Sequence, residues 1–309
     1  MNASNLLSPS IRFWQRGWHN ANHILLLGGE GSVLVDTGGD EDGAVLVAMM
    51  KNEGVTAAAL SLIVNTHSHW DHSGGNRIIK ALSGAPLAAS PLAAAWFARQ
   101  ERRLTWLDYF AVPFEFVPAD LIWQDGDEVQ LGEFLWQVIA IPGHAPDAIA
   151  LYQPEHKLLI SADALHLNDC GIINVAVHGW EALDAAAHTI HRLQQLDIAL
   201  ALPGHGPLIT DVPASLERIA AMLAQFRADP EKLYRHLVRR VFMATVLACQ
   251  PVSRSALVAW MLALPWTTDY LPTSGYADAA AQLHDLLTTF MRQGVIVEQD
   301  GLLACTVPK

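Results

Sequence analysis

The sequence predicts an α/β fold in which strands and helices alternate. Short apolar runs, such as residues 33–35, 62–64 and 158–160, each end in polar residues, glycine or proline. Continuous apolar runs of this length are typical of strands that are buried on both faces. Segments suited to helices lie between the runs, and this alternation favours a layered arrangement of sheets and helices.

The individual elements can be assigned in chain order. Further strands are expected at residues 138–141 and 198–202. Helical candidates lie at residues 40–53, 74–83, 91–103 and 180–195. The stretch 128–141 carries Gly132 midway and is predicted to be a β-hairpin, so the sheets are expected to mix parallel and antiparallel strands.

A long helix is predicted to follow Asp211, which can cap it, with Pro213 in its first turn. Apolar residues recur at helical spacing in this segment, at Leu216, Ile219, Leu223 and Phe226. Asp229 and Pro230 end the helix. We therefore predict two domains, a catalytic domain at residues 1–229 and a smaller one at residues 230–309.

The C-terminal part shows helical patterns followed by an apolar stretch at residues 294–305. Asp300 and Gly301 favour a β-hairpin turn there. Helices followed by a terminal hairpin resemble a winged-helix module of the α+β class.

Composition restricts the partners. The chain has 31 Asp+Glu against 19 Lys+Arg, a net charge of −12, which disfavours nucleic acid. Three cysteines without a CxxC pair indicate reduced thiols. The N-terminal residues do not resemble a signal peptide, and no apolar run has membrane-spanning length. A cytoplasmic protein without a membrane-embedded part is expected.

The segment from His67 to His72 carries the strongest chemical signal. It holds three imidazoles and a carboxylate within six residues, directly after a predicted strand. Burying such groups is costly unless they bind a metal ion. In an extended turn His67 and His69 project to one side, and Asp71 and His72 can reach a second ion.

Three more candidate ligands stand at the ends of other predicted strands. His144 and His205 each lie in a Pro-Gly-His turn, and Asp163 follows the strand at 158–160. Ligands offered from several strand ends can converge on one edge of a sheet sandwich. The alternative, a surface histidine cluster, does not account for these distant residues.

Together these residues resemble the metallo-β-lactamase superfamily over roughly residues 20–210. The resemblance rests on Asp36-Thr37-Gly38, His67-x-His69-x-Asp71-His72, His144, Asp163 and Pro203-Gly204-His205. It implies an αββα sandwich of two mixed β-sheets that binds two divalent ions. Zinc is favoured, and iron or manganese is compatible with the same ligands.

The resemblance also implies a ligand for each position. The first ion would take His67, His69 and His144. The second would take Asp71, His72 and His205, with Asp163 as a bridge. Pro203-Gly204-His205-Gly206-Pro207 and the C-terminal module resemble the group with a β-lactamase-associated winged helix. Antibiotic-cleaving members of the superfamily are usually secreted, so they fit the expected cytoplasmic location less well. Glyoxalase-II-like enzymes typically carry Cys-Gly-His-Glu at the last ligand, where this chain has Pro203-Gly204-His205-Gly206.

These features predict a hydrolase of a small molecule that uses a bridging hydroxide on an ester, thioester or lactone. Asp71 and Asp163 are expected catalytic residues, and His166 is a candidate proton donor with a packed histidine as the alternative. Asp36 is expected to support a ligand imidazole, and Asp147 is considered for the same role. A phosphodiesterase or endoribonuclease, and a non-catalytic ligand sensor, are the rival functions.

Two further clusters have alternative interpretations. Aromatic residues crowd the stretch 96–116, and they could wall a substrate cleft, form a homodimer contact or simply pack in the core. Residues 171–178 could line the pocket or form a connecting strand. Arg235, Arg239 and Arg240 fit a solvated helix face, and the C-terminal part as a whole is predicted to be structural or to cover the substrate.

Overall fold

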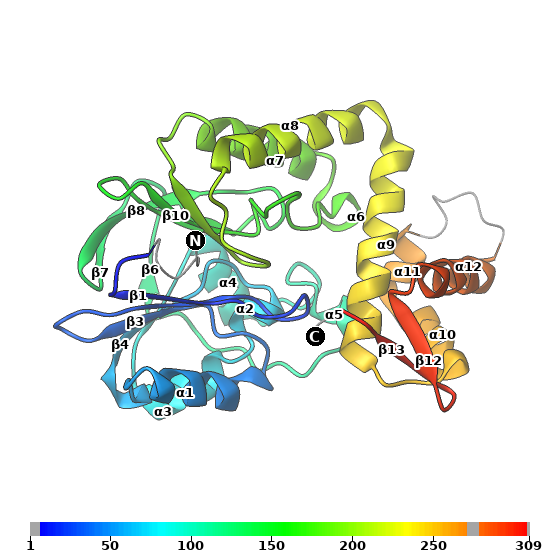
Figure 1. Cartoon of the computed structure of the whole chain (residues 1–309), viewed down its shortest axis with the longest axis horizontal. Helices are drawn as coiled ribbons and strands as arrows, with labels where there is room; N and C mark the ends of the chain where they lie inside the picture. The colour runs from blue at the N-terminus through cyan, green and yellow to red at the C-terminus, as the bar shows by residue number, and fades with distance from the viewer. Residues whose placement is uncertain (1–6, 271–277, 308–309) are drawn as a thin grey trace.

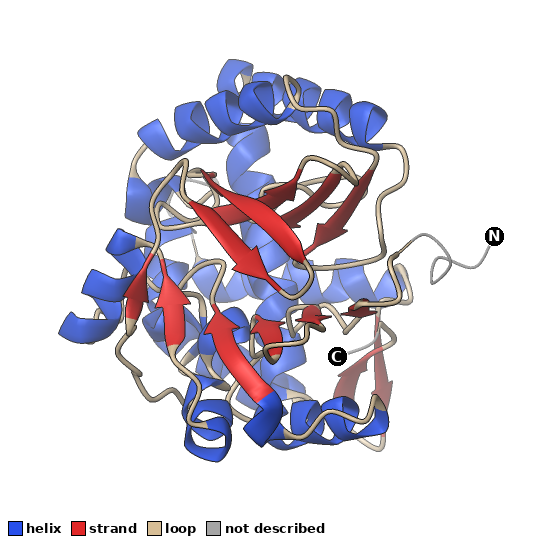
Figure 2. Ribbon diagram, turned by 90° about the vertical axis from the view of Figure 1, so that its left-hand side faces the viewer, coloured by secondary structure: helices blue, strands red, loops and turns tan. Residues whose placement is uncertain are grey.

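The computed structural model describes residues 7–270 and 278–307. Two mixed β-sheets stack face to face and carry helices on both outer sides (Figure 1 and Figure 2). This arrangement confirms the α/β prediction and the αββα sandwich that the resemblance implied.

The first sheet has the strand order β1-β2-β3-β4-β5-β6. Its strands are β1 (Ile11–Trp14), β2 (His23–Leu26), β3 (Ser32–Val35), β4 (Leu60–Val64), β5 (Leu87–Ala89) and β6 (Leu121–Ile122). β1 to β3 pair antiparallel, whereas β3 to β6 pair in parallel. The predicted strands 33–35 and 62–64 are neighbours in this sheet, and Val35 pairs with Val64 at their ends.

The second sheet has the order β11-β10-β9-β8-β7. Its strands are β7 (Glu128–Leu131), β8 (Phe134–Ala140), β9 (Ile149–Gln153), β10 (Leu158–Ala162) and β11 (Leu200–Pro203). β10 pairs with β11 in parallel, and the other neighbours pair antiparallel. The predicted hairpin at 128–141 is confirmed as β7 and β8, and Gly132 adopts a φ of 59° in its turn.

Helices cover both outer faces of the sandwich. They are α1 (Asp42–Asn52), the 3-10 turn η2 (Ala57–Ala59), α2 (Trp70–Ser73), α3 (Asn76–Ser83), α4 (Pro91–Arg99), α5 (Leu107–Phe110), α6 (Val175–His178), α7 (Glu181–Leu193) and α8 (Val212–Ala228). One apolar cluster fills the space between the sheets, and another lies between the first sheet and α1, α3 and α4. The sandwich is therefore held by burial on both faces of each sheet.

The predicted helices are present, with small differences at their ends. α4 begins where Ser90 Oγ accepts a hydrogen bond from the Ala93 amide at 3.2 Å. It ends at Arg99, four residues before the predicted end, because Gln100 turns to a left-handed φ of 55°. The alternative of a connecting strand at 171–178 is wrong, since Val175–His178 form the short helix α6. Asp211 caps α8 as predicted, accepting from the Ala214 amide at 3.2 Å.

Within residues 230–270 and 278–307, the C-terminal part consists of four helices and a two-stranded sheet. These elements are α9 (Pro230–Cys249), α10 (Arg254–Ala263), α11 (Pro265–Tyr270), α12 (Ala279–Arg292), β12 (Ile296–Gln299) and β13 (Leu302–Cys305). The hairpin turn is confirmed at Asp300 and Gly301, whose φ values are 52° and 76°. The winged-helix assignment stays a prediction.

The C-terminal helices pack directly on the sandwich. α9 stands between the sandwich and the helices α10 to α12 (Figure 1). One buried apolar cluster includes Ile190 of α7, Ile219 of α8 and Val241 of α9. The division at residue 229 falls between α8 and α9 and remains a prediction.

Among the described residues, no helix is both long and apolar enough to cross a bilayer.

The packing of α9 on α12 leads to a first prediction. Phe242 is fully buried, and its ring stacks on Phe290 with centroids 5.6 Å apart. Phe242→Ala is expected to lower the free energy of unfolding by about 3–5 kcal/mol, because it leaves a cavity in the core. Urea unfolding measures this loss. As a control, Val297→Ala changes a side chain that is 44% exposed and should stay within about 0.5 kcal/mol. An equal, small effect of both substitutions would contradict this packing.

Candidate metal centre

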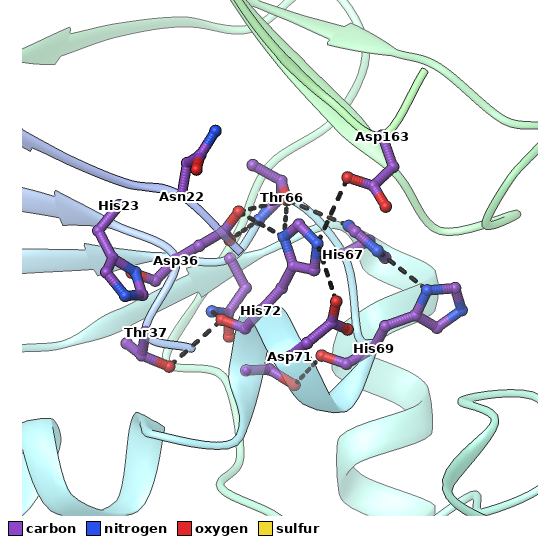
Figure 3. A network of polar contacts seen from close by, with 12 residues as sticks. Asn22, His23, Asp36, Thr37, Thr66, His67, His69, Asp71, His72 and Asp163 are labelled. Atoms are coloured by element: carbon purple, nitrogen blue, oxygen red, sulfur yellow. Dashed lines mark hydrogen bonds and ion pairs between the residues drawn. The ribbon is translucent and has the colours of Figure 1, made fainter. Parts of the chain in front are cut away.

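Four strand ends supply the predicted ligands. The segment His67–His72 follows β4, His144 follows β8, Asp163 follows β10 and His205 follows β11. All seven predicted ligands meet at one edge of the sandwich, and Figure 3 shows those from the first sheet facing Asp163. The structure therefore brings together side chains from distant parts of the sequence, as the strand-end argument predicted.

His67, His69 and His144 form the first group of candidate ligands. His69 Nδ1 lies 3.0 Å from His67 Nε2 and 2.9 Å from His144 Nε2. Nitrogens around a tetrahedral zinc ion, each about 2.0–2.1 Å from it, lie roughly 3.3 Å apart. The three ring nitrogens therefore face one another at nearly the spacing of zinc ligands. This arrangement fits a shared metal ion better than hydrogen bonds between the imidazole rings.

Asp71, His72 and His205 form the second group. Asp71 Oδ2 lies 3.1 Å from His205 Nε2 and 3.8 Å from His72 Nε2. Asp163 stands between the two groups. One of its oxygens is 3.4 Å from His72 Nε2, and the other is 3.3 Å from His144 Nε2. Asp163 thus occupies the position that a bridging carboxylate requires.

The surroundings of both groups fit metal binding. His72 Nε2, the ring nitrogen that faces Asp71 and Asp163, is buried and makes no hydrogen bond to any described residue. Such unsatisfied buried atoms are costly unless another partner is bound. Gly204 keeps the site open, because a Cβ there would lie 2.2 Å from Asp163 Oδ1. The donor set of imidazoles and carboxylates suits zinc, iron or manganese alike.

The two groups of candidate ligands differ in the pKa values of their side chains. Burial lowers the pKa of His67 and His69 well below the ordinary value and that of His144 to about 4, so these rings are neutral and can coordinate a cation. Burial also disfavours charge on His72, but nearby Asp36, Asp163 and Asp71 outweigh it and raise its pKa. Burial likewise raises the pKa of Asp163, but the neighbouring His205 and His72 outweigh it and leave this carboxyl ionised.

Asp36 supports the second group, as predicted. Its Oδ2 lies 2.8 Å from His72 Nδ1, so the other ring nitrogen of His72 points towards the site. The Thr66 amide and hydroxyl both donate to Asp36 at 2.8 Å and fix the carboxylate (Figure 3). Asp147 has a different hydrogen-bond partner, because its Oδ2 accepts from the Ser68 amide at 2.7 Å and its Oδ1 makes no hydrogen bond to any described residue.

Loss of this support is expected to weaken the second site. Asp36→Ala should reduce the affinity for the second ion by about 10- to 100-fold, since the His72 ring loses the group that orients it. Competition with a metal-binding dye measures both affinities. The first ion should bind nearly as before, because His67, His69 and His144 do not contact Asp36. An unchanged second affinity would show that Asp36 is dispensable for the site.

His166 lies behind the ligands instead of facing the cavity. It is 3% exposed, and its Nε2 is 3.3 Å from Asp163 Oδ1. Its Nδ1 is 3.3 Å from Asp169, which in turn accepts from Arg240 of α9 at 2.8 Å. This chain of contacts links the C-terminal helix to Asp163. The geometry suits a positioning role, whereas the proton-donor role of His166 stays a prediction.

A cavity of about 400 Å³ opens onto the ligands. Asp71, His144, Asp163 and His205 reach it from the metal centre. Trp106 covers part of the site, with its ring 4.3 Å from that of His69. Trp106 and Phe110 are the residues of the predicted aromatic cluster that line the cavity, while others of the cluster, such as Phe97, are buried in the core. Gly171 and Ile172 line it too, as one interpretation of that segment predicted.

The opposite wall of the cavity comes from the C-terminal part, and the sequence did not identify its residues. They are His236, Arg239, Arg240, Met243, Ala244, Leu247, Phe290, Val295 and Val307. The prediction of a solvated face is wrong for Arg239 and Arg240, which line the cavity. Helical spacing indicated an amphipathic helix there, but which surface its inner face covers depends on how α9 docks.

Comparisons with known proteins agree with this geometry. Residues 16–205 match the family model described as metallo-beta-lactamase superfamily. A hydroxyacylglutathione hydrolase of Brucella anthropi is 29% identical over 167 residues, which are 54% of this chain and 56% of that protein. An acyl-coenzyme A thioesterase of Gallus gallus is 33% identical over 117 residues, or 34% of this chain and 42% of that protein. The chain therefore spans about half the length of these two relatives.

A solved structure extends the comparison to nearly the whole chain. A metallo-beta-lactamase family protein from Thermus thermophilus superposes with a TM-score of 0.61 over 96% of this chain and 99% of that one. Its sequence identity is 20%, so this likeness concerns the fold. The family model covers more than half of the chain and includes every candidate ligand. The chain therefore belongs to the metallo-beta-lactamase superfamily.

Proposed function

We propose that this protein is a metal-dependent hydrolase that cleaves the thioester bond of a small acyl substrate. The observation that carries the proposal is a pair of buried ligand groups joined by Asp163 at the floor of a largely apolar cavity. Esters and lactones present the same carbonyl chemistry, and they complete the proposed substrate class. The thioesterase relative favours the thioester among them.

The candidate ligands are assigned to two metal ions. His67, His69 and His144 would hold one divalent ion, Asp71, His72 and His205 the other, and Asp163 would contact both. Two bound ions supply a water that ionises near neutral pH, and they polarise the carbonyl oxygen. Zinc is the proposed metal, with iron or manganese as alternatives that the donor set also suits.

Asp71 is the proposed proton acceptor. Its side chain is 16% exposed, and it lines the cavity beside His205. Burial raises its pKa, but His72 and His205 outweigh burial and hold the pKa at about 2, so the carboxylate is ionised and can accept a hydrogen bond from the attacking water. Trp106 and Phe110 line the cavity, and Trp106 packs on the His69 ring, so these side chains would shield the metal centre from bulk water.

The test is hydrolysis by the metal-loaded protein. Acyl thioesters, matched oxygen esters, lactones and single-stranded RNA are assayed side by side, with release of free thiol, acid or nucleotide as the signal. The proposal predicts turnover of thioesters that greatly exceeds any RNA cleavage. RNA cleavage without thioester turnover would favour the phosphodiesterase or endoribonuclease, and binding without turnover in any assay would favour the ligand sensor.

A further inference from the structure

The C-terminal wall of the cavity is apolar except for two arginines and a histidine. Met243 and Leu247 of α9 and Val295 form an apolar surface that faces the metal centre across the cavity. Arg239 lies on the same helix, one turn before Met243. The substrate preference inferred from this wall rests on the proposed function, because both concern the substrate of the same cavity.

The three clustered arginines of α9 differ in their partners. Arg235 forms an ion pair with Glu231 at 3.1 Å, on the exposed side of the helix. Arg240 donates to Asp169 at 2.8 Å and to the Cys170 carbonyl at 2.7 Å. Arg239, in contrast, forms no ion pair with a carboxylate of residues 7–270 or 278–307. Two of the three charges are thus matched by protein groups, and the third is not.

Arg239 is nevertheless held in place. Its guanidinium carbon lies 4.6 Å from the centroid of the Phe290 ring, a cation–π contact. One terminal nitrogen donates to Gln293 Oε1 at 3.4 Å. These neutral partners orient the guanidinium and leave its charge uncompensated. The remaining donors are available to a ligand.

An unmatched cation in this wall is unusual for so acidic a chain. The protein has 31 Asp+Glu and only 19 Lys+Arg, so a nearby carboxylate would be easy to supply. Burial lowers the pKa of the neighbouring His236 to about 4, and this ring is therefore neutral. Arg239 is the cavity-lining cation whose charge no described residue offsets, and guanidinium binds carboxylate and phosphate strongly.

We infer that the substrate of this cavity carries an anionic group, a carboxylate or a phosphate, that pairs with Arg239. The apolar part of the same substrate lies along Met243, Leu247 and Val295. The preferred substrates are therefore anionic acyl thioesters or esters, and neutral ones are poor substrates.

Matched probes test this inference. One pair consists of the hexanoyl thioester of 3-mercaptopropionate and the hexanoyl thioester of 3-mercaptopropionamide, which differ in charge but hardly in size. A second anionic probe places the carboxylate at the far end of the acyl chain. Phosphate is tested with the thioester of a mercaptoethyl phosphate. We compare kcat/KM of the wild-type, Arg239→Gln and Arg235→Gln proteins, the last as a control one turn away on the exposed side.

The wild-type protein should prefer at least one anionic probe over the neutral amide by about 10- to 100-fold, the range of a charge-assisted hydrogen bond. Arg239→Gln should remove this preference by lowering kcat/KM for the anionic probe far more than for the neutral probe. Arg235→Gln should keep the preference. The probe that responds shows which end of the substrate carries the anion. If no anionic probe depends on Arg239, the inference is overturned.

A binding measurement separates this inference from the proposed function. The thioether analogues of the same probes cannot be hydrolysed, and calorimetry gives their Kd for the metal-loaded protein. Binding that requires both the anionic group and Arg239, without turnover of any thioester, would support the anion site and refute the hydrolase. Turnover of thioesters, together with equal affinity for the anionic and neutral analogues, would support the hydrolase and refute the anion site.

Discussion

Removal of the bound metal with a chelator is expected to abolish thioester hydrolysis and to lower Tm by about 5–15 °C. The reason is the burial of the ligands. The five histidines and Asp163 are each at most 7% exposed, and the side chain of Asp71 is 16% exposed. Without cations, the desolvated carboxylates and the unsatisfied buried ring nitrogens oppose folding. Activity assays and thermal unfolding before and after chelation measure both effects.

Restoring the metal supplies the control for this prediction. Zinc, iron or manganese added back to the chelated protein should recover both Tm and activity, and the recovered activity ranks the three metals as cofactors of this site. Magnesium prefers oxygen ligands and should recover neither. A chelated protein that retains full activity and Tm would contradict a structural and catalytic role of the ions.

Asp163→Asn is expected to reduce kcat/KM by about 1,000-fold or more. The carboxylate stands between the two ligand groups, at 3.3 Å from His144 Nε2 and 3.4 Å from His72 Nε2, and an amide offers only one oxygen. Losing the bridge should release one ion and with it several kcal/mol of stabilisation of the developing charge. Steady-state kinetics and metal content per chain measure these losses.

Asp285→Asn is the matched control for this substitution. Asp285 lies on the exposed side of α12 and makes the same change of charge far from the ligand groups. It should leave both kinetics and metal content unchanged, and circular dichroism should show that both variants are folded. Wild-type activity of the Asp163 variant would refute its bridging position.

The fold was predictable where burial leaves a direct trace in the sequence. β3, β4 and β10 are each buried along their whole length or nearly so, and they therefore stand out as apolar runs. Caps at Ser90 and Asp211 mark helix starts through ordinary side-chain chemistry. The metal ligands were predictable for a different reason, because three imidazoles and a carboxylate within six residues after a buried strand are costly to bury unless they bind a metal ion.

Contacts made by docking were not predictable in this way. Arg235, Arg239 and Arg240 share one helical segment, yet they contact solvent-side Glu231, the Phe290 ring and Asp169 respectively. Their spacing specifies a helix but not which surface that helix meets. His166 illustrates the same limit, since its contact with Asp163 and Asp169 follows from a turn and not from a periodic pattern.

The central claim is that seven side chains at this sandwich edge hold a pair of ions, and crystallographic anomalous scattering at a metal absorption edge tests it most directly. The account predicts two peaks per chain. One should be surrounded by His67, His69 and His144, the other by Asp71, His72 and His205, with Asp163 between them. A metal-loaded crystal with no anomalous peak at these side chains, or with its peaks elsewhere on the molecule, would contradict the account.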